Sequence, residues 1–231
     1  MKRPDSEETL WSALRSRART SPAAPLITFY DLATGERMEL SAASLDNAVA
    51  KTAGLLRDEL DIAPGDTIVI RLPLHWQKAV WQGASSAVGA RLDPNADPSE
   101  AKVLVTDRDS LDARGSARDT VVVSLEPFGL PSRDPLPADV IDHAVAARGH
   151  PDVFTPWAPP IPDGTSATAE SVRARRGFGP SARILVADSD PDADDLMLAV
   201  PLAIAGTAVL VRHAASGDVE AVATAERVTA R

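Results

Sequence analysis

A short run of hydroxyl side chains beside a glycine is the first stretch whose residue types could do chemistry. Gly164, Thr165, Ser166 and Thr168 lie within the segment Asp163–Glu170. Backbone N–H groups in a glycine-containing loop, together with hydroxyl groups, can bind phosphate oxygens. We therefore treat these four residues as a candidate nucleotide-binding site. The alternative is a solvent-exposed loop with no ligand.

The pair His75–Trp76 is a second candidate. It follows the apolar run Thr67–Leu72, which predicts a buried strand, and it opens a pattern of helical periodicity. Ligands of α/β proteins bind outside the carboxyl ends of parallel strands. We therefore predict that His75 and Trp76 lie on a ligand-facing loop. The alternative is that Trp76 packs in the core and Pro73 only sets the entry to the helix.

An acidic run at 188–195 suggests a calcium site, but its spacing does not fit a calcium-binding loop. Asp188, Asp190 and Asp192 fit the first, third and fifth positions of an EF-hand loop, but Ala193 replaces the glycine and Ala199 the final glutamate. An acidic first turn of a helix explains the run better, because negative charge is favourable there. The 4 histidines show no metal-ligand spacing and the chain has 0 cysteines. We predict no metal site and assign no catalytic residue.

The composition excludes several classes of partner. The 231 residues carry a formal net charge of −9, and their basic residues are scattered, which argues against nucleic-acid binding. No stretch approaches the roughly 20 apolar residues of a membrane span. The N-terminus lacks the apolar core of a signal peptide. We expect a soluble cytoplasmic protein that binds neither nucleic acid nor membranes.

The stretch Ser41–Gly89 predicts the elements that position these candidates. Ser41 is a suitable N-cap for a helix, and a second helix runs from Trp76 to Gly89 after the strand Thr67–Leu72. The first helix has an apolar stripe at spacings of three and four: Leu45, Val49, Thr52, Leu55 and Leu56. Helix, buried strand and helix in this order are typical of a parallel α/β sheet.

The remaining elements are predicted from the same signals. Residues 26–30 and 36–40 form a hairpin, after a first helix over Ser6–Arg17 capped by Asp5 or Ser6. Further strands are expected at 90–94, 102–106, 120–125, 182–188 and 206–211. Further helices are expected at 138–148, 168–176, 196–205 and near 219–223.

These elements predict an α/β fold with a mostly parallel sheet flanked by helices and a small β-hairpin near the N-terminus. We divide the chain into an N-terminal α/β unit at 1–126, a proline-rich connection at 127–167 and a strand–helix–strand unit at 168–231. We expect the last unit to pack on the first, so that the whole forms one compact domain.

The scaffold residues resemble a known family. Pro25–Ser41, Ile62–Pro73, Gly179–Val186 and Ala199–Val211 are similar to the N-terminal portion of the AMP-forming acyl-CoA synthetases, the adenylate-forming enzymes with an AMP-binding domain. Among these, the arrangement resembles a short actinobacterial group of uncharacterised truncated homologues. The resemblance covers most of the chain, and it implies the fold more strongly than the activity.

The resemblance also implies where ATP and Mg²⁺ would bind. Complete synthetases carry a Thr/Ser/Gly-rich loop with a lysine that binds ATP phosphates, and its counterpart is Asp163–Glu170, which has one glycine and no lysine. Arg173 or Arg175 would have to replace that lysine. The chain ends at Arg231, before the family's adenine-binding motif, ribose-binding aspartate and C-terminal domain.

Two functions follow from the resemblance. The first is a truncated, non-catalytic homologue that acts as a binding or interaction module. A homodimer or a protein partner would then cover the face left by the missing C-terminal parts. The alternative is a residual nucleotide-binding or acyl-ligand-binding protein with weak or partner-dependent adenylating activity, of the acid–thiol ligase type.

Overall fold

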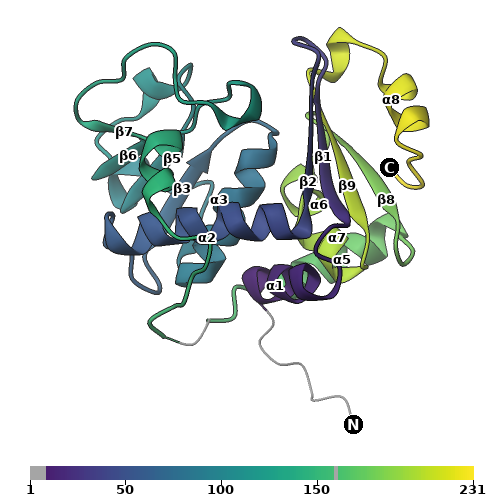
Figure 1. Cartoon of the computed structure of the whole chain (residues 1–231), viewed down its shortest axis with the longest axis horizontal. Helices are drawn as coiled ribbons and strands as arrows, with labels where there is room; N and C mark the ends of the chain where they lie inside the picture. Colours follow the sequence, from purple (N-terminus) through teal and green to yellow (C-terminus); the bar gives the residue numbers. More distant parts are fainter. Residues whose placement is uncertain (1–8, 159–160) are drawn as a thin grey trace. The chain divides into compact units, whose positions relative to one another are not determined.

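The computed structural model describes residues 9–158 and 161–231. By its internal contacts the chain divides into two compact units whose segments alternate along the sequence (Figure 1). Unit 1 comprises Met1–Asp46, Pro73–Ala79 and Pro162–Arg231, and unit 2 comprises Asn47–Leu72 and Val80–Ile161. These units divide the chain differently from the segments 1–126, 127–167 and 168–231, and a single compact domain stays a prediction.

Unit 1 is built on a four-stranded sheet in the order β2-β1-β9-β8. β1 (Pro25–Asp31) and β2 (Glu36–Ser41) form the predicted antiparallel hairpin. β9 (Thr207–Arg212) pairs parallel with β1, and β8 (Arg183–Ala187) pairs parallel with β9. Figure 1 shows purple β1 beside yellow-green β9, although most of the chain separates them in sequence. The carboxyl ends of β1, β9 and β8 therefore meet at one edge of the sheet.

The connection from β8 to β9 corrects one prediction. The apolar helix expected at 196–205 is two short helices, α6 (Ala193–Leu196) and α7 (Ala199–Ala203). Pro201 explains the interruption, because its ring excludes the carbonyl of the residue four positions earlier in a continuous helix. In α7 this proline lies in the first turn, where it is tolerated. The parallel strand–helix–strand unit itself is confirmed.

Three further helices belong to unit 1. α1 (Leu10–Thr20) starts from Thr9, whose hydroxyl accepts the N–H of Ser12. It runs to Thr20 rather than to Arg17, and the expected caps Asp5 and Ser6 lie outside the described residues. α5 (Thr165–Arg176) precedes β8. α8 (Val219–Ala225) packs its residues Val222 and Ala223 against strand residues of β8 and β9.

Unit 2 contains an all-parallel five-stranded sheet in the order β4-β3-β5-β6-β7. Its strands are β3 (Thr67–Arg71), β4 (Arg91–Leu92), β5 (Val103–Thr106), β6 (Asp119–Val122) and β7 (Val140–Asp142). The parallel sheet and its β-branched, buried strands agree with the predicted fold class.

The two predicted long helices are present, and α2 carries the predicted apolar stripe. α2 (Ala42–Asp58) begins after Ser41, whose hydroxyl accepts the N–H of Ser44, and α3 (Trp76–Val88) ends before Gly89, which has a φ of 74°. All five stripe residues of α2 are buried. Within unit 2 the helices approach closely at Gly83, where an added Cβ would lie 2.7 Å from a methyl group of Val49. No helix in the described ranges has the length and apolar content that crossing a membrane would require.

The predicted helix over 138–148 is wrong in its first half. Val140–Asp142 is strand β7, which pairs with β6, and only His143–Ala146 is helical (α4). The Asp142 carboxylate accepts the N–H groups of Ala144 and Val145 and so starts α4 after the strand. Single 3₁₀ turns complete the described connections: Pro98–Glu100, Leu111–Ala113, Pro127–Gly129, Ala147–Gly149 and Ala214–Ser216.

Candidate functional site

A pocket between three helices of unit 1 contains two of the residues predicted to bind nucleotide. It has a volume of about 200 Å³ and opens to solvent. α1, α5 and α7 supply its walls: Thr9, Leu10, Ala13, Thr165, Ser166, Ala169, Ala199, Leu202 and Ala203. We call it the α5 pocket. Among the residues that the structure describes, its lining consists of alanine, leucine and hydroxyl side chains and includes no charged residue.

Of the four predicted residues, Thr165, Ser166 and Thr168 lie in helix α5, and Gly164 is its N-cap. α5 begins at Thr165, three residues before its predicted start, with Gly164 as N-cap at a φ of 73°. The Asp163 carboxylate accepts the N–H of Thr165 at 3.1 Å, which favours this earlier start. Thr165 and Ser166 line the pocket, and the Thr168 hydroxyl donates back to the Gly164 carbonyl at 3.3 Å.

Asp163 links the first turns of two helices at this site, although it was not among the predicted residues. One carboxylate oxygen accepts the N–H of Leu10 at 3.0 Å, and the other accepts the N–H of Thr165 at 3.1 Å. The carboxylate therefore caps the first turns of α1 and α5 together, where helix dipoles favour negative charge. An aspartate two residues before a helix start is a recognisable capping signal, but α1 as its second partner is not visible in the sequence.

The arginines of α5 lie in its last turn and are all ion-paired. Arg173 pairs with Glu170 at 2.8 Å, and Arg175 pairs with Asp192. Arg176 pairs with Asp190 at 2.9 Å, and its hydrogen bonds lower the pKa of that carboxyl group. Arg173 and Arg175, the predicted substitutes for a phosphate-binding lysine, are thus held at the far end of the helix.

Two residues of the acidic run, Asp190 and Asp192, pair with these arginines. Asp190 and Asp192 accept hydrogen bonds from Arg176, and the Asp188 carboxylate accepts the N–H of His213. Asp194 and Asp195 form the acidic first turn of α6, as the sequence analysis preferred. Among residues 9–158 and 161–231, no group of histidine, aspartate and glutamate residues is arranged to hold a metal.

His75 and Trp76 are buried. His75 is fully buried: its Nδ1 accepts the N–H of Gln77 at 3.2 Å, and its ring meets that of Phe29 edge-on at 4.5 Å. Burial lowers the pKa of His75 to about 3, so the ring is neutral. The Nε2 of His75 and the Nε1 of Trp76 are buried without a hydrogen-bond partner. Both side chains pack as core aromatics, and a ligand-facing role for them stays a prediction.

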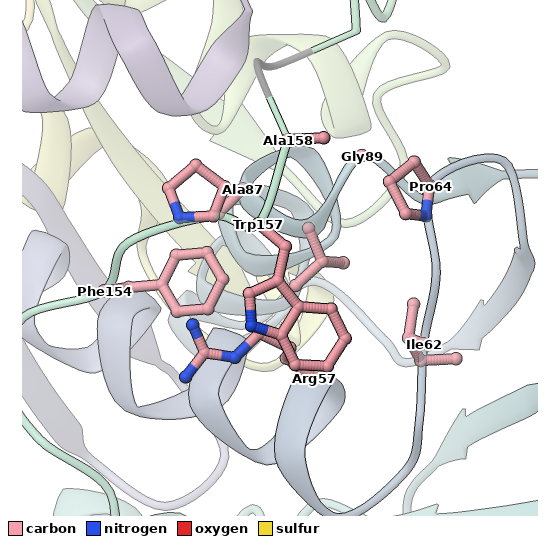
Figure 2. A pocket seen from close by; sticks show the side chains of 10 residues that line it. Arg57, Ile62, Pro64, Ala87, Gly89, Phe154, Trp157 and Ala158 are labelled. Carbon is pink, nitrogen blue, oxygen red and sulfur yellow. The ribbon is translucent and has the colours of Figure 1, made fainter.

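A second pocket, in unit 2, is too small for a ligand (Figure 2). Its volume is about 20 Å³, which is about the space that one water molecule needs. The guanidinium of Arg57 lies 4.8 Å from the ring centre of Phe154 and 5.4 Å from that of Trp157. Phe154 is buried, whereas Trp157 is 72% exposed. Phe154 therefore anchors this segment, whereas most of the Trp157 side chain is exposed to solvent.

The fold is that of acyl-CoA synthetases. A crystal structure of an acyl-CoA synthetase from Brucella canis matches with a TM-score of 0.73 and 18% identity, over 99% of this chain and 48% of that chain. An acetoacetyl-CoA synthetase from Streptomyces lividans matches with a TM-score of 0.67 and 19% identity, over 88% of this chain and 38% of that chain. The chain thus spans about half the length of these enzymes or less.

No protein-family model matches the chain. A curated protein of Mycobacterium tuberculosis (strain ATCC 25618 / H37Rv), described as a "TIGR03089 family protein", is 36% identical over 208 residues, covering 85% of each chain. The chain belongs to this family. The mycobacterial relative agrees with the expected actinobacterial group.

Proposed function

We propose that this chain is a binding module built on the acyl-CoA synthetase fold and does not adenylate a substrate by itself. The position of the Asp163 carboxylate carries the proposal. It accepts N–H groups from the first turns of both α1 and α5, the groups that would otherwise be available to a phosphate. A phosphate entering there would have to displace this carboxylate or approach its negative charge.

Among the described residues, the arginines of α5 do not lie near its start. The three arginines of the helix lie in its last turn, and a helix of 12 residues is about 18 Å long. Lys78, the lysine of unit 1 among the described residues, is ion-paired with Asp194. Transfer of an adenylyl group needs positive charge or N–H donors at the phosphates. Among the described residues, the lining of the α5 pocket has no basic side chain, and the N–H groups of Leu10 and Thr165 are bonded to Asp163.

The lining of the α5 pocket suits a small uncharged group. Its volume of about 200 Å³ exceeds the roughly 150 Å³ of an engineered apolar cavity that binds benzene. Alanine and leucine side chains would contact the apolar part of a ligand, and the hydroxyls of Thr165 and Ser166 would fix its polar end. We therefore propose ligand binding without phosphate recognition.

One observation favours the second candidate, a residual nucleotide-binding or acyl-ligand-binding protein. Thr165 and Ser166 line the pocket, and both come from the segment that resembles the ATP loop. Under this alternative, ATP with Mg²⁺ would bind weakly, and adenylation would depend on a partner that supplies the missing cation.

Calorimetric titration distinguishes the two candidates. Mg-ATP should give no binding heat at millimolar concentration, whereas Asp163→Ala should gain weak phosphate binding because the helix N–H groups become free. A non-hydrolysable acyl-adenylate mimic should bind to the wild type only through its acyl part. Mg-ATP binding tighter than about 100 μM, roughly −5.5 kcal/mol, would contradict the proposal if Thr165→Ala/Ser166→Ala removed it. Thr168→Ala is the matched control, because that hydroxyl lies outside the pocket lining.

A further inference from the structure

The strand ends of unit 1 bring together an unusual set of polar side chains, which we call the strand-end cluster: Asp31, His75, Arg212 and His213. Asp31 ends β1, and Arg212 ends β9 as its register partner, so both side chains lie on one face of the sheet. His213 follows directly, and His75 packs on Phe29 of β1. The carboxyl ends of parallel strands are where open α/β sheets bind ligands.

Asp31 is the fixed centre of the cluster. It is 5% exposed, and its Oδ1 accepts the N–H groups of Ala33 and Thr34 at 2.9 and 3.2 Å. The same oxygen lies 2.8 Å from Nδ1 of His213. Burial alone would raise the pKa of Asp31, but the hydrogen bonds from His213 and from the two backbone N–H groups lower it below its usual value. The carboxylate is therefore ionised, and it requires that Nδ1 of His213 carry the proton.

His213 is held in a strained backbone conformation with its ring open to solvent. Its φ is 53°, a region that residues with a Cβ rarely adopt, and the Asp188 carboxylate holds its N–H at 2.8 Å. The side chain is 40% exposed. Because Nδ1 carries the proton, the neutral ring presents Nε2 as a hydrogen-bond acceptor, and no described residue binds it.

The other three histidines do not offer such a nitrogen. His75 and His143 are buried, and His150 has Nε2 at 2.9 Å from Glu59 and Nδ1 at 3.9 Å from Asp58. His213 is thus singled out by geometry rather than by sequence.

Arg212 supplies the complementary donors. Its side chain is only 18% exposed, yet within the described residues its one polar contact is Asp31 Oδ2 at 3.9 Å, which is too long for a hydrogen bond. A guanidinium has five N–H donors, and no Arg212 nitrogen is among the fully buried side-chain atoms that lack a hydrogen bond, so its donors remain accessible to a ligand. The positive charge of Arg212 also reaches His75, whose buried Nε2 has no partner. Within the described residues, the Arg212 guanidinium and Nε2 of His75 thus have no hydrogen-bond partner in the protein.

We propose that the strand-end cluster binds a small oxyanion that also carries an O–H group, such as a 2-hydroxycarboxylate or a hydrogen phosphate. The guanidinium of Arg212 donates to the oxyanion in the forked geometry that matches a carboxylate or phosphate. The ligand O–H donates to Nε2 of His213, which Asp31 orients from the other side. This site is separate from the α5 pocket and does not depend on the function proposed for it.

Histidine NMR signals and calorimetry test the site. With 4 histidines in the chain, each ring signal can be assigned from one His→Gln variant. Glycolate and inorganic phosphate should shift the His213 signal in a saturable way, with a dissociation constant of about 1 mM or below. Acetate, which lacks the O–H, should bind at least fivefold more weakly than glycolate. The signals of His143 and His150 should not move.

Variants of Arg212 distinguish binding by the forked guanidinium from simple attraction by a positive charge. Arg212→Gln should abolish binding, and Arg212→Lys should weaken it about tenfold, because the charge remains without the fork. Arg231→Gln, which removes an exposed arginine paired with Glu220, should leave binding unchanged. His213→Gln, at a half-exposed position, should remove the calorimetric preference for glycolate over acetate.

Two results would overturn the proposal. One is the absence of any saturable response to both glycolate and phosphate up to about 20 mM. The other is an equal response in Arg212→Gln and the wild type. Binding of phosphate without glycolate, or of glycolate without phosphate, would support the site and identify the source of its oxyanion.

Discussion

Two histidines differ from ordinary surface histidines because the fold buries them in the neutral form. His75 belongs to unit 1, and burial lowers its pKa to about 3. His143 belongs to unit 2, where its Nε2 lies 2.9 Å from the Thr52 hydroxyl and burial lowers its pKa to about 4. Each unit therefore contains one histidine that takes up a proton only after unfolding.

This difference predicts a loss of stability in mild acid. Between pH 6.5 and about 4 the unfolded chain binds protons that the folded chain does not, so the free energy of unfolding falls as the pH falls. From pH 7 to pH 5 the loss should be about 2 kcal/mol for each histidine. Urea unfolding at these two pH values measures it. His143→Gln should remove its share of this loss, and an unchanged pH dependence would contradict the assignment.

At the scale of elements, close contact rather than sequence pattern fixes the connection into β9. Gly206 lies between α7 and β9, and an added Cβ would lie 2.3 Å from the Ala182 carbonyl oxygen. That carbonyl accepts the N–H of Thr207 at 3.0 Å, so it cannot move away without loss of a hydrogen bond. Glycine is required here for space.

Gly206→Ala should therefore destabilise unit 1 by about 2–4 kcal/mol, as severe overpacking does. Gly179→Ala is the matched control on the other side of β8. Nothing lies within 4 Å of its added Cβ, and its φ is not positive. That variant should be neutral or more stable by about 0.4–1 kcal/mol, because alanine restricts the unfolded chain. Equal effects of the two variants in urea unfolding would refute the steric explanation.

At the scale of the whole molecule, apolar side chains on one segment of unit 2 point to a protein partner. Val153, Trp157 and Ile161 are 71%, 72% and 48% exposed. Clustered exposed apolar residues are typical of interaction surfaces. A homodimer or protein partner is expected on the face left by the missing C-terminal parts, and we propose that it covers this segment.

Light scattering tests self-association. At tens of micromolar, roughly the range in which a weak dimer with a micromolar Kd is populated, the wild type should exceed the monomer mass, and Val153→Ser/Trp157→Ser should return it to the monomer. Phe128→Ser, at a residue 70% exposed in a different connection, should leave the mass unchanged. A clean wild-type monomer would leave only a different protein as the partner.

Local signals were sufficient for most elements. The stripe of α2, the buried β-branched runs of β3, β5 and β9, and the glycine that ends α3 each act within a few residues, so the sequence alone predicts them. The α/β class and the candidate pair Thr165 and Ser166 followed from the same signals and from the family resemblance.

Features that depend on contacts between residues far apart in the sequence became visible only in the tertiary structure. Val140–Asp142 is a strand because β6 offers it an edge, which its own helical periodicity does not reveal. Asp163 caps a helix 153 positions away, and Asp31 orients a histidine 182 positions away. The sequence determines local propensity over a turn or a strand. Which distant groups meet depends on the path of the chain, because such contacts form only when packing within a unit brings the groups together.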